Sequence, residues 1–481
     1  MLVGSVVVYM LVTIAIGLYA ARRVHGARDF VQAGRSLPLY MNLATVFATW
    51  FGAETVLSVS ATFARDGLTG IPADPFGASA CLILVALFFA RAFYRMDLMT
   101  IGDFYRKRFG KSTEVLTSMA ITISYLGWTS AQLTALGLVL LVLTGGALSL
   151  STCIIIGAAI VLFYTIWGGM WSVALTDLFQ SVVILVGITV IAWLIGDMAG
   201  GAGKVINAAI EADKLRFWPT GGYVEWLAFG AAFLTRALGS IPQQDVFQRV
   251  TSAKDERTAV RGTLGGGILY FCFAFVPMFI AYAALVLDPS VAELFKADDA
   301  REIQRILPDL ILSKTPVWAQ IIFFGALLSA ILSTASGALL APTSLFAENV
   351  LRPFLHHLSD HKFLVLLRTV LVAFTAGALV FALNSKSTMY EMIQNAYKVT
   401  LVMAFIPLVF GLFWRRSTTQ GALAAAILGL VSWLFCEWVI GPEPIPPQLV
   451  GLAVSFAAMI IGSLLPQFLI GHPQAPEPDR V

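Results

Sequence analysis

Long apolar runs, separated by short stretches of charged residues, Gly and Pro, extend over almost the whole chain. An α-helix needs about 20 predominantly apolar residues to cross the hydrocarbon core of a bilayer. The pattern therefore predicts an all-α integral membrane protein with about thirteen transmembrane helices. The predicted spans are residues 2–20, 39–65, 73–95, 114–143, 149–167, 171–198, 222–242, 262–288, 316–348, 363–384, 388–412, 420–440 and 446–470.

The composition narrows the class of protein further. Of the 481 residues, 58% are hydrophobic and 12% are charged, which leaves too little polar surface for a soluble enzyme. The formal net charge is +3 and the chain has no long basic tract, so we expect no nucleic-acid partner. The four cysteines lie inside apolar runs without metal-ligand spacing, which indicates neither a disulfide framework nor a zinc site.

Positive charge in the loops predicts the orientation of the chain. One set of alternate loops, together with the C-terminal tail, holds nineteen Lys and Arg residues, Arg249 among them, and the other set holds nine. Because Lys and Arg favour cytoplasmic loops, the first set is assigned to the cytoplasm. The N-terminus is then outside, the C-terminus is cytoplasmic, and the protein is expected in the plasma or inner membrane.

Two of the predicted spans, 39–65 and 222–242, are interrupted by polar residues and lie five positions apart in the order of spans. An odd number of helices per unit inverts the second copy, so this pairing favours an inverted repeat of five-helix units with a midplane site at the broken helices. Ordinary helix packing at small residues is the alternative. The interrupting residues are Thr45, Thr49, Gly52, Glu54 and Thr55 in the first span and Gly239, Ser240, Pro242, Gln243 and Gln244 at the end of the second.

A pair of hydroxyl side chains marks the predicted span 316–348. Ala330, Ser333 and Thr334 are spaced i, i+3, i+4, so two hydroxyls and one backbone carbonyl can point the same way. Hard alkali cations prefer oxygen ligands, and carbonyls freed at a helix break can supply the remainder. We therefore predict a sodium site here, with tight helix packing as the alternative.

Charged residues inside predicted spans are functional candidates because a charge near the bilayer centre is costly. Arg236, close to the break in the span 222–242, is predicted to bind an anionic group of a solute, or else to pair internally with Glu54 or Asp177. Asp177 lies near the inner end of its span and is assigned to sodium release or to support of the sodium site. Lys398 is interpreted as a fixed positive charge or as a partner of Glu54.

Aromatic and amide side chains form a second group of candidates. Trp128 and Gln132 are spaced i, i+4 and share one helix face, which suits a ring that stacks on a solute beside an amide that hydrogen-bonds to it. Trp50 precedes the break in the span 39–65. Helix packing is the alternative role for all three side chains.

Two sequence patterns resemble motifs of the sodium:solute symporter family, and the resemblance covers nearly the whole chain. They are Gly168-Gly169-x3-Val173-x2-Thr176-Asp177-x2-Gln180 and the pair Ser333-Thr334. The resemblance implies a LeuT-like 5+5 inverted repeat with one extra helix before it and two after it. A single domain of residues 1–481 is expected, with a leading helix and loop in 1–38, the repeat core in 39–412, and two additional helices and a tail in 413–481.

The same resemblance assigns individual site residues. Around Trp50, Trp128 and residues 241–250 the chain is most similar to the choline-transporter-like branch, which surrounds a methylated cation with aromatic rings. Two matching positions are Ala78 and Gln243 here, which argues against a complete aromatic cage. The predicted sodium-binding residues are Ala48, Phe51, Ala330, Ser333, Thr334 and Asp177, and the predicted substrate-binding residues are Trp50, Glu54, Trp128, Gln132, Arg236, Gln243 and Gln244.

These observations predict a secondary active transporter rather than an enzyme. It would carry a small polar organic solute across the cytoplasmic membrane by alternating access, with Na+ as the coupling ion and no other cofactor. Proton coupling through Glu54 or Asp177 is one alternative, and a passive channel is a less favoured one. The long outer loops, 199–221 and 289–315, contain no His and Cys cluster and no nucleophile motif, which argues against a membrane-embedded enzyme.

Overall fold

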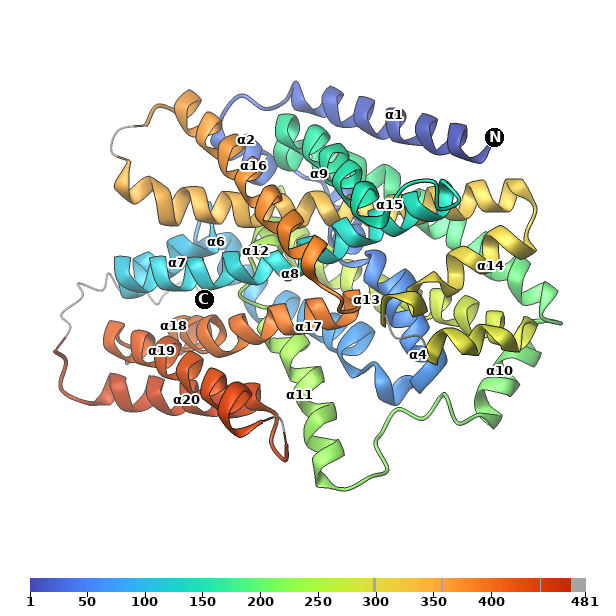
Figure 1. Cartoon of the computed structure of the whole chain (residues 1–481). Coiled ribbons are helices and arrows are strands. Elements are labelled where there is room, and N and C mark those ends of the chain that lie inside the picture. The colour runs from blue at the N-terminus through green and yellow to red at the C-terminus, as the bar shows by residue number, and fades with distance from the viewer. Residues whose placement is uncertain (297–299, 356–357, 442, 469–481) are drawn as a thin grey trace.

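A computed structural model describes residues 1–296, 300–355, 358–441 and 443–468 (Figure 1). Helices form most of this described part, and its one β contact is an isolated bridge between Leu37 and Ala253. The α-helices are α1 (Leu2–Ala21), α2 (Ala27–Gln32), α3 (Leu39–Trp50), α4 (Ser60–Asp66), α5 (Ala78–Leu84), α6 (Ala90–Arg95), α7 (Ile101–Phe109), α8 (Lys111–Leu143), α9 (Leu150–Met198), α10 (Ala202–Glu211), α11 (Tyr223–Gly239), α12 (Gln244–Ser252), α13 (Glu256–Leu287), α14 (Ile306–Lys314), α15 (Val317–Leu345), α16 (Asp360–Asn384), α17 (Met389–Thr400), α18 (Ile406–Phe413), α19 (Thr419–Phe435) and α20 (Pro447–Leu464). Short 3-10 or π-helical segments join or extend them: η1 (Ala33–Arg35), η2 (Glu54–Val59), η3 (Leu68–Gly70), η4 (Pro72–Gly77), η5 (Val85–Phe89), η6 (Pro289–Lys296), η7 (Ala300–Arg305), η8 (Phe346–Leu351), η9 (Arg352–Phe354), η10 (Leu401–Phe405) and η11 (Cys436–Ile440).

The number of membrane-spanning helices is the point at which the structure and the apolar pattern differ. Among the described residues, ten helices are long and apolar enough to cross a membrane, or up to twelve when each of two bent pairs is taken as one span. The predicted span 149–167 corresponds to the first part of α9, whose apolar portion Leu150–Phe163 is shorter than a full span. The all-α membrane architecture is present, and the count of thirteen stays a prediction.

A turn at Gly169 divides α9 at the boundary predicted between two spans. Its φ of 49° and ψ of −142° lie outside the helical region. A Cβ at this position would lie 2.3 Å from the carbonyl oxygen of Phe30 in α2. The positive φ and the close approach of α2 therefore both require glycine at this turn.

Both spans that the sequence predicts to be broken are bent. The helix α3 meets the helical segment that begins at Glu54 at an angle of 53°, and α11 meets α12 at 44°. At the first bend Phe51 has φ −86° and ψ 76°, which ends the helical conformation of α3. Bends of this kind release backbone groups from helical hydrogen bonds, and inside a membrane such groups are tolerated where protein surrounds them or where they line a binding site.

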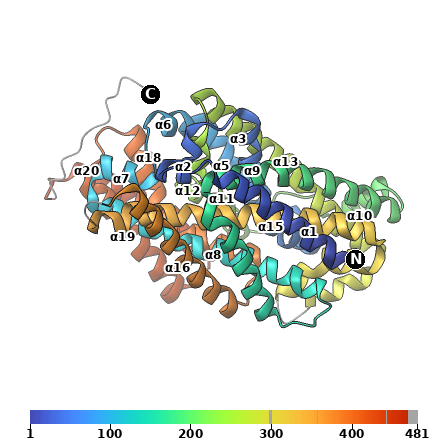
Figure 2. The same cartoon turned by 90° about the horizontal axis from the view of Figure 1, so that it is seen from above.

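The broken helices lie against the most buried helices of the molecule. In the most apolar window of each helix, 83% of the residues are buried in the segment that contains α15 and 72% in α8, against 17% in α1. In Figure 1, α1 runs along the upper edge and α19 and α20 lie together at the lower left, and in Figure 2 α1 crosses the face turned towards the viewer. Because α3 packs against α15, the first bend faces the molecular interior.

Close packing of α11 against α17 at the second bend gives a testable prediction. A Cβ on Gly239 would lie 2.6 Å from the carbonyl oxygen of Tyr397, so Gly239→Ala should push the two helices apart and lower stability by about 1–3 kcal/mol. Gly230→Ala, on the same helix, meets no atom within 4 Å and serves as the matched control. Thermal unfolding of the two purified variants measures the difference, and equal melting temperatures would contradict the packing described here.

Candidate functional site

The predicted sodium ligands of α15 meet the end of α3 at the first bend. The Ser333 hydroxyl donates to the carbonyl oxygens of Ala48 at 2.9 Å and of Ala330 at 3.1 Å. The Thr334 hydroxyl donates to the same Ala48 oxygen at 3.3 Å. The structure therefore brings four of the predicted ligand residues into one buried cluster of oxygen atoms. Phe51 lies at the bend next to this cluster, and its role as a carbonyl ligand stays a prediction.

A buried carboxylate and a buried guanidinium lie near this cluster. Asp177 of α9 is fully buried and close enough to Arg249 for electrostatic attraction, and neither of its carboxyl oxygens has a hydrogen-bond partner within the described part of the protein. Arg249 of α12 is 1% exposed, and it donates to the Thr49 hydroxyl through Nε at 3.1 Å and Nη2 at 2.9 Å. Arg249 was expected in a loop and lies instead in a buried helix. The reason is that α12, although polar in sequence, continues α11 beyond the bend and is buried along its whole length.

A glycine on α15, Gly337, leaves space for the Arg249 guanidinium. A Cβ on Gly337 would lie 2.5 Å from Nη2 of Arg249. The glycine, one turn after the hydroxyl pair, is a feature of the sequence that is consistent with a bulky neighbour, but it does not identify Arg249. A search for charges confined to apolar runs misses Arg249, because α12 is not an apolar run.

A second buried guanidinium, Arg236, lies on the other broken span. Its Nη2 is 3.5 Å from Oδ2 of Asp74 and 3.9 Å from Oε1 of Glu54. The guanidinium carbon lies over the ring of Trp50 at 4.9 Å and over the ring of Tyr397 at 4.6 Å. Of the internal partners that the sequence left open, Glu54 is therefore near Arg236, whereas the guanidinium that attracts Asp177 electrostatically is that of Arg249.

Asp74, the nearer carboxylate, is a residue that the sequence analysis missed. It lies in η4 with a non-helical conformation (φ −139°, ψ 121°) between Pro72 and Pro75. Its Oδ1 accepts a hydrogen bond from the Tyr270 hydroxyl. The two prolines indicate a loop at the end of a span, although Asp74 falls inside the predicted span 73–95 and a charge count there would have identified it.

The Glu54 carboxylate connects the Arg236 group to α8. Gln132 donates from Nε2 to Oε2 of Glu54 at 2.7 Å, and its own Oε1 accepts from the backbone N–H of Ala53 at 3.3 Å. Trp128, one turn earlier on α8, packs near the ring of Tyr397, with ring centroids 6.5 Å apart.

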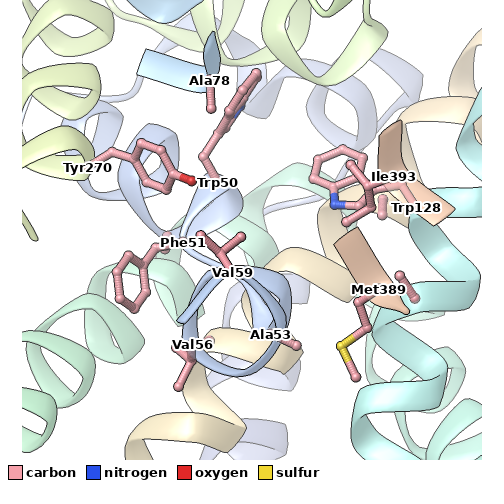
Figure 3. Close-up of a cluster of buried hydrophobic side chains, with 14 of the residues drawn as sticks. Trp50, Phe51, Ala53, Val56, Val59, Ala78, Trp128, Tyr270, Met389 and Ile393 are labelled. Carbon is pink, nitrogen blue, oxygen red and sulfur yellow. The ribbon is translucent and has the colours of Figure 1, made fainter. Parts of the chain in front are cut away.

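Five of the seven predicted substrate-binding residues therefore form one buried group around the two bends. Figure 3 shows Trp50, Ala78 and Tyr270 on one side of this region and Trp128, Met389 and Ile393 on the other. The five residues are Trp50, Glu54, Trp128, Gln132 and Arg236.

Three other polar residues lie apart from this group. Gln243 donates to the hydroxyls of Ser124 at 3.0 Å and Thr400 at 3.3 Å, about one turn along α8 from Trp128. Gln244 accepts from the backbone N–H of Ile101 at the start of α7 at 2.9 Å. Lys398 pairs with Glu437 at 3.3 Å, so the predicted pairing with Glu54 is wrong. The partner comes from η11, near the end of the chain, which spacing along α17 does not reveal.

Comparison with known proteins identifies the family of this chain. A model of the Sodium:solute symporter family matches residues 30–429. The chain belongs to this family. Sodium is its coupling ion, and the protein is a multi-pass membrane transporter rather than an enzyme.

Among the relatives of this symporter are proteins that carry different solutes. It is 28% identical to the high affinity choline transporter 1 of Homo sapiens, over 92% of this chain and 76% of that protein, and 26% identical to the high-affinity choline transporter 1 of Caenorhabditis elegans, over 92% and 78%. It is 23% identical to the sodium/glucose cotransporter of Vibrio parahaemolyticus, over 92% and 86%. The solved structure of a Na+-coupled sialic acid symporter in a substrate-bound outward-open state superposes with a TM-score of 0.79 at 19% identity, over 96% of this chain and 97% of that one. The predicted LeuT-like fold class is thereby confirmed.

The side chains at the centre of this symporter are not accessible to solvent. Trp50, Glu54, Trp128 and Arg236 are each 1% exposed. Several polar atoms in and beside this group have no hydrogen-bond partner within the protein, which is expensive in a buried site unless a ligand satisfies them. These atoms are Nε and Nη1 of Arg236, Nε1 of Trp128, the hydroxyl of Tyr397 and Oε1 of Gln243.

The environment of Asp177 generates a prediction for sodium dependence. Asp177→Asn removes a negative charge near the Ser333 and Thr334 hydroxyls and leaves Asp245 as the carboxyl partner of Arg249, so a cation at these hydroxyls should be less strongly attracted. We expect the sodium concentration for half-maximal transport to rise about tenfold. Asp197→Asn makes the same chemical change at the exposed end of the same helix and should leave this concentration unchanged. A change in solute selectivity without a change in sodium dependence would instead place Asp177 in the solute pocket.

Proposed function

We propose that this symporter carries a small polar organic solute into the cell together with Na+ by alternating access, with the ion held at the first bend. The observation that carries this proposal is the meeting of two α15 hydroxyls with the freed end of α3 at the Ala48 carbonyl oxygen. Hydroxyl and carbonyl oxygens suit a hard monovalent cation. The proposed ligands are Ala48, Phe51, Ala330, Ser333 and Thr334, with Asp177 as the supporting carboxylate on the way to the cytoplasm.

The solute is proposed to bind among the five grouped side chains at the two bends. Trp50 and Trp128 offer ring surface, and Gln132, Glu54 and Arg236 offer hydrogen-bonding groups. Gln243 and Gln244 are proposed to contribute from the adjacent turn of the second bend. The N-terminus outside and the C-terminus in the cytoplasm complete the proposed topology.

The chemistry of the buried group favours a solute with acceptor oxygens over a quaternary amine. A methylated cation is held by ring faces. Here the Arg236 guanidinium already lies over Trp50 and Tyr397, so these two faces are occupied by a cation of the protein. The free N–H groups of Arg236 and Trp128 suit carboxylate, carbonyl or hydroxyl oxygens of a solute.

A choline-like solute is the second candidate, because the most similar relatives reported above are choline transporters. A screen of the purified protein by thermal shift separates the two. A bound ligand raises the apparent melting temperature by mass action. Amino acids, sugars, carboxylates and quaternary amines should be tested with Na+ and with K+ at fixed pH. We expect a shift with an oxygen-bearing solute in Na+ only, and a shift that depends on pH but not on Na+ would contradict the proposal.

The hydroxyl pair on α15 gives a direct prediction for the sodium site. The double variant Ser333→Ala with Thr334→Ala removes two oxygen ligands and should raise the sodium concentration for half-maximal uptake more than about tenfold. The same helix offers a matched control in Thr343→Ala with Ser344→Ala, since these hydroxyls bond only to the carbonyls of Leu339 and Leu340 one turn earlier. If both double variants keep the sodium dependence of the unmodified protein, the ion does not bind at this pair.

A further inference from the structure

The absence of a side chain on Gly52 brings the proposed sodium site and the Arg236 group into direct proximity. A Cβ at Gly52 would lie 2.4 Å from Oε2 of Glu54 and 2.7 Å from the hydroxyl oxygen of Thr334. The distance between these two oxygens therefore cannot exceed the sum of those two values. A carboxylate that belongs to the solute site thus lies within a few ångströms of a proposed sodium ligand.

The same carboxylate is only loosely bound to Arg236. Oε1 of Glu54 is 3.9 Å from Nη2 of Arg236 and has no hydrogen-bond partner within the protein. Oε2, which faces Thr334, is oriented by the Gln132 amide. Arg236 has a nearer carboxylate in Asp74, which the Tyr270 hydroxyl holds in place. Arg236 therefore remains paired even when the charge of Glu54 acts on another cation.

With both carboxylates ionised, the formal charges of this group would be balanced by one further monovalent cation. Glu54 and Asp74 contribute two negative charges and Arg236 contributes one positive charge, and the side chains of all three are at most 4% exposed. Buried charge without compensation is unfavourable in a medium of low dielectric constant. A sodium ion at the first bend would supply the missing positive charge.

We infer that Glu54 is shared between Arg236 and the coupling ion, and that this sharing links sodium binding to solute binding. This inference rests on the proposed sodium site at Ala48, Ser333 and Thr334. With sodium bound, the ion takes up the negative charge of Glu54, so the positive charge of Arg236 is less compensated and its free N–H groups attract an acceptor oxygen of the solute more strongly. Sodium and solute then raise each other's affinity by the same factor.

If Glu54 is shared in this way, substitutions of Glu54 and of Arg236 should change sodium affinity in opposite directions. Glu54→Gln removes the negative charge beside the ion, so the sodium concentration for half-saturation should rise about tenfold. Arg236→Gln removes the competing cation, so this concentration should fall about tenfold. The combined variant Glu54→Gln with Arg236→Gln should resemble Glu54→Gln, because there is no longer a carboxylate for which the two cations compete.

Because Arg236→Gln alone could impair folding, a second variant with balanced charge is needed. Arg236→Gln leaves two buried carboxylates without a counter-ion, whereas Asp74→Asn combined with Arg236→Gln keeps the formal charge of the group unchanged and also frees Glu54. This combined variant should bind sodium more tightly than the unmodified protein. Lys398→Gln removes a partly buried cation whose partner is Glu437, and as the matched control it should leave sodium affinity unchanged.

The measurement needs no knowledge of the solute. Sodium chloride is titrated into the purified full-length protein, with potassium chloride keeping ionic strength constant, and binding is followed by the fluorescence of the tryptophans and by thermal shift. Shifts of opposite sign in the Glu54 and Arg236 variants support the inference. Shifts of the same sign, or none, overturn it if Ser333→Ala with Thr334→Ala still abolishes the response. A sodium response that survives this double variant overturns the proposed site as well.

Discussion

Two buried guanidinium groups determine which acidic side chains must lie near the two bent helices. Arg236 and Arg249 are each 1% exposed, and a charge in such a place must be compensated by neighbours. Each has two carboxyl groups among its electrostatic partners, so each group holds one more acidic side chain than basic. The bends of α3 and α11, and the glycines that let side chains approach, all serve to bring these charges together. The carboxylates are Asp74 and Glu54 around Arg236, and Asp177 and Asp245 around Arg249.

Much of the architecture could be predicted because the membrane requires it. A spanning helix must be apolar over its length, and a helix that breaks inside the bilayer must show Gly, Pro or polar residues at the break. These two rules located the bends near Gly52 and Gly239 and the turn at Gly169. The spacing of Ser333 and Thr334 likewise predicted one polar helix face, and the structure brings that face against Ala48.

Three charged residues were misassigned or missed for one physical reason: the partners of a charged side chain are set by distance in space and not by separation along the chain. Lys398 is paired by Glu437 from a helix that the sequence analysis treated as an addition to the core. Arg249 was counted among loop charges because α12 is polar, although the protein and not the lipid surrounds it. Asp74 was passed over at the edge of a span, although Tyr270, nearly two hundred residues later, fixes its carboxylate beside Arg236.

The uneven charge of the Arg236 group has a consequence for the electrical behaviour of transport. With both carboxylates ionised, the group is negative when no ion is bound and neutral once a sodium ion and a solute of zero net charge have joined it. A potential of 100 mV acts on one elementary charge with about 2.3 kcal/mol, and it does little to a neutral complex. The voltage would then act mainly on the return of the unloaded carrier, in which a negative centre is drawn towards the positive, outer side of the membrane. The loaded carrier would cross at a rate that hardly depends on voltage.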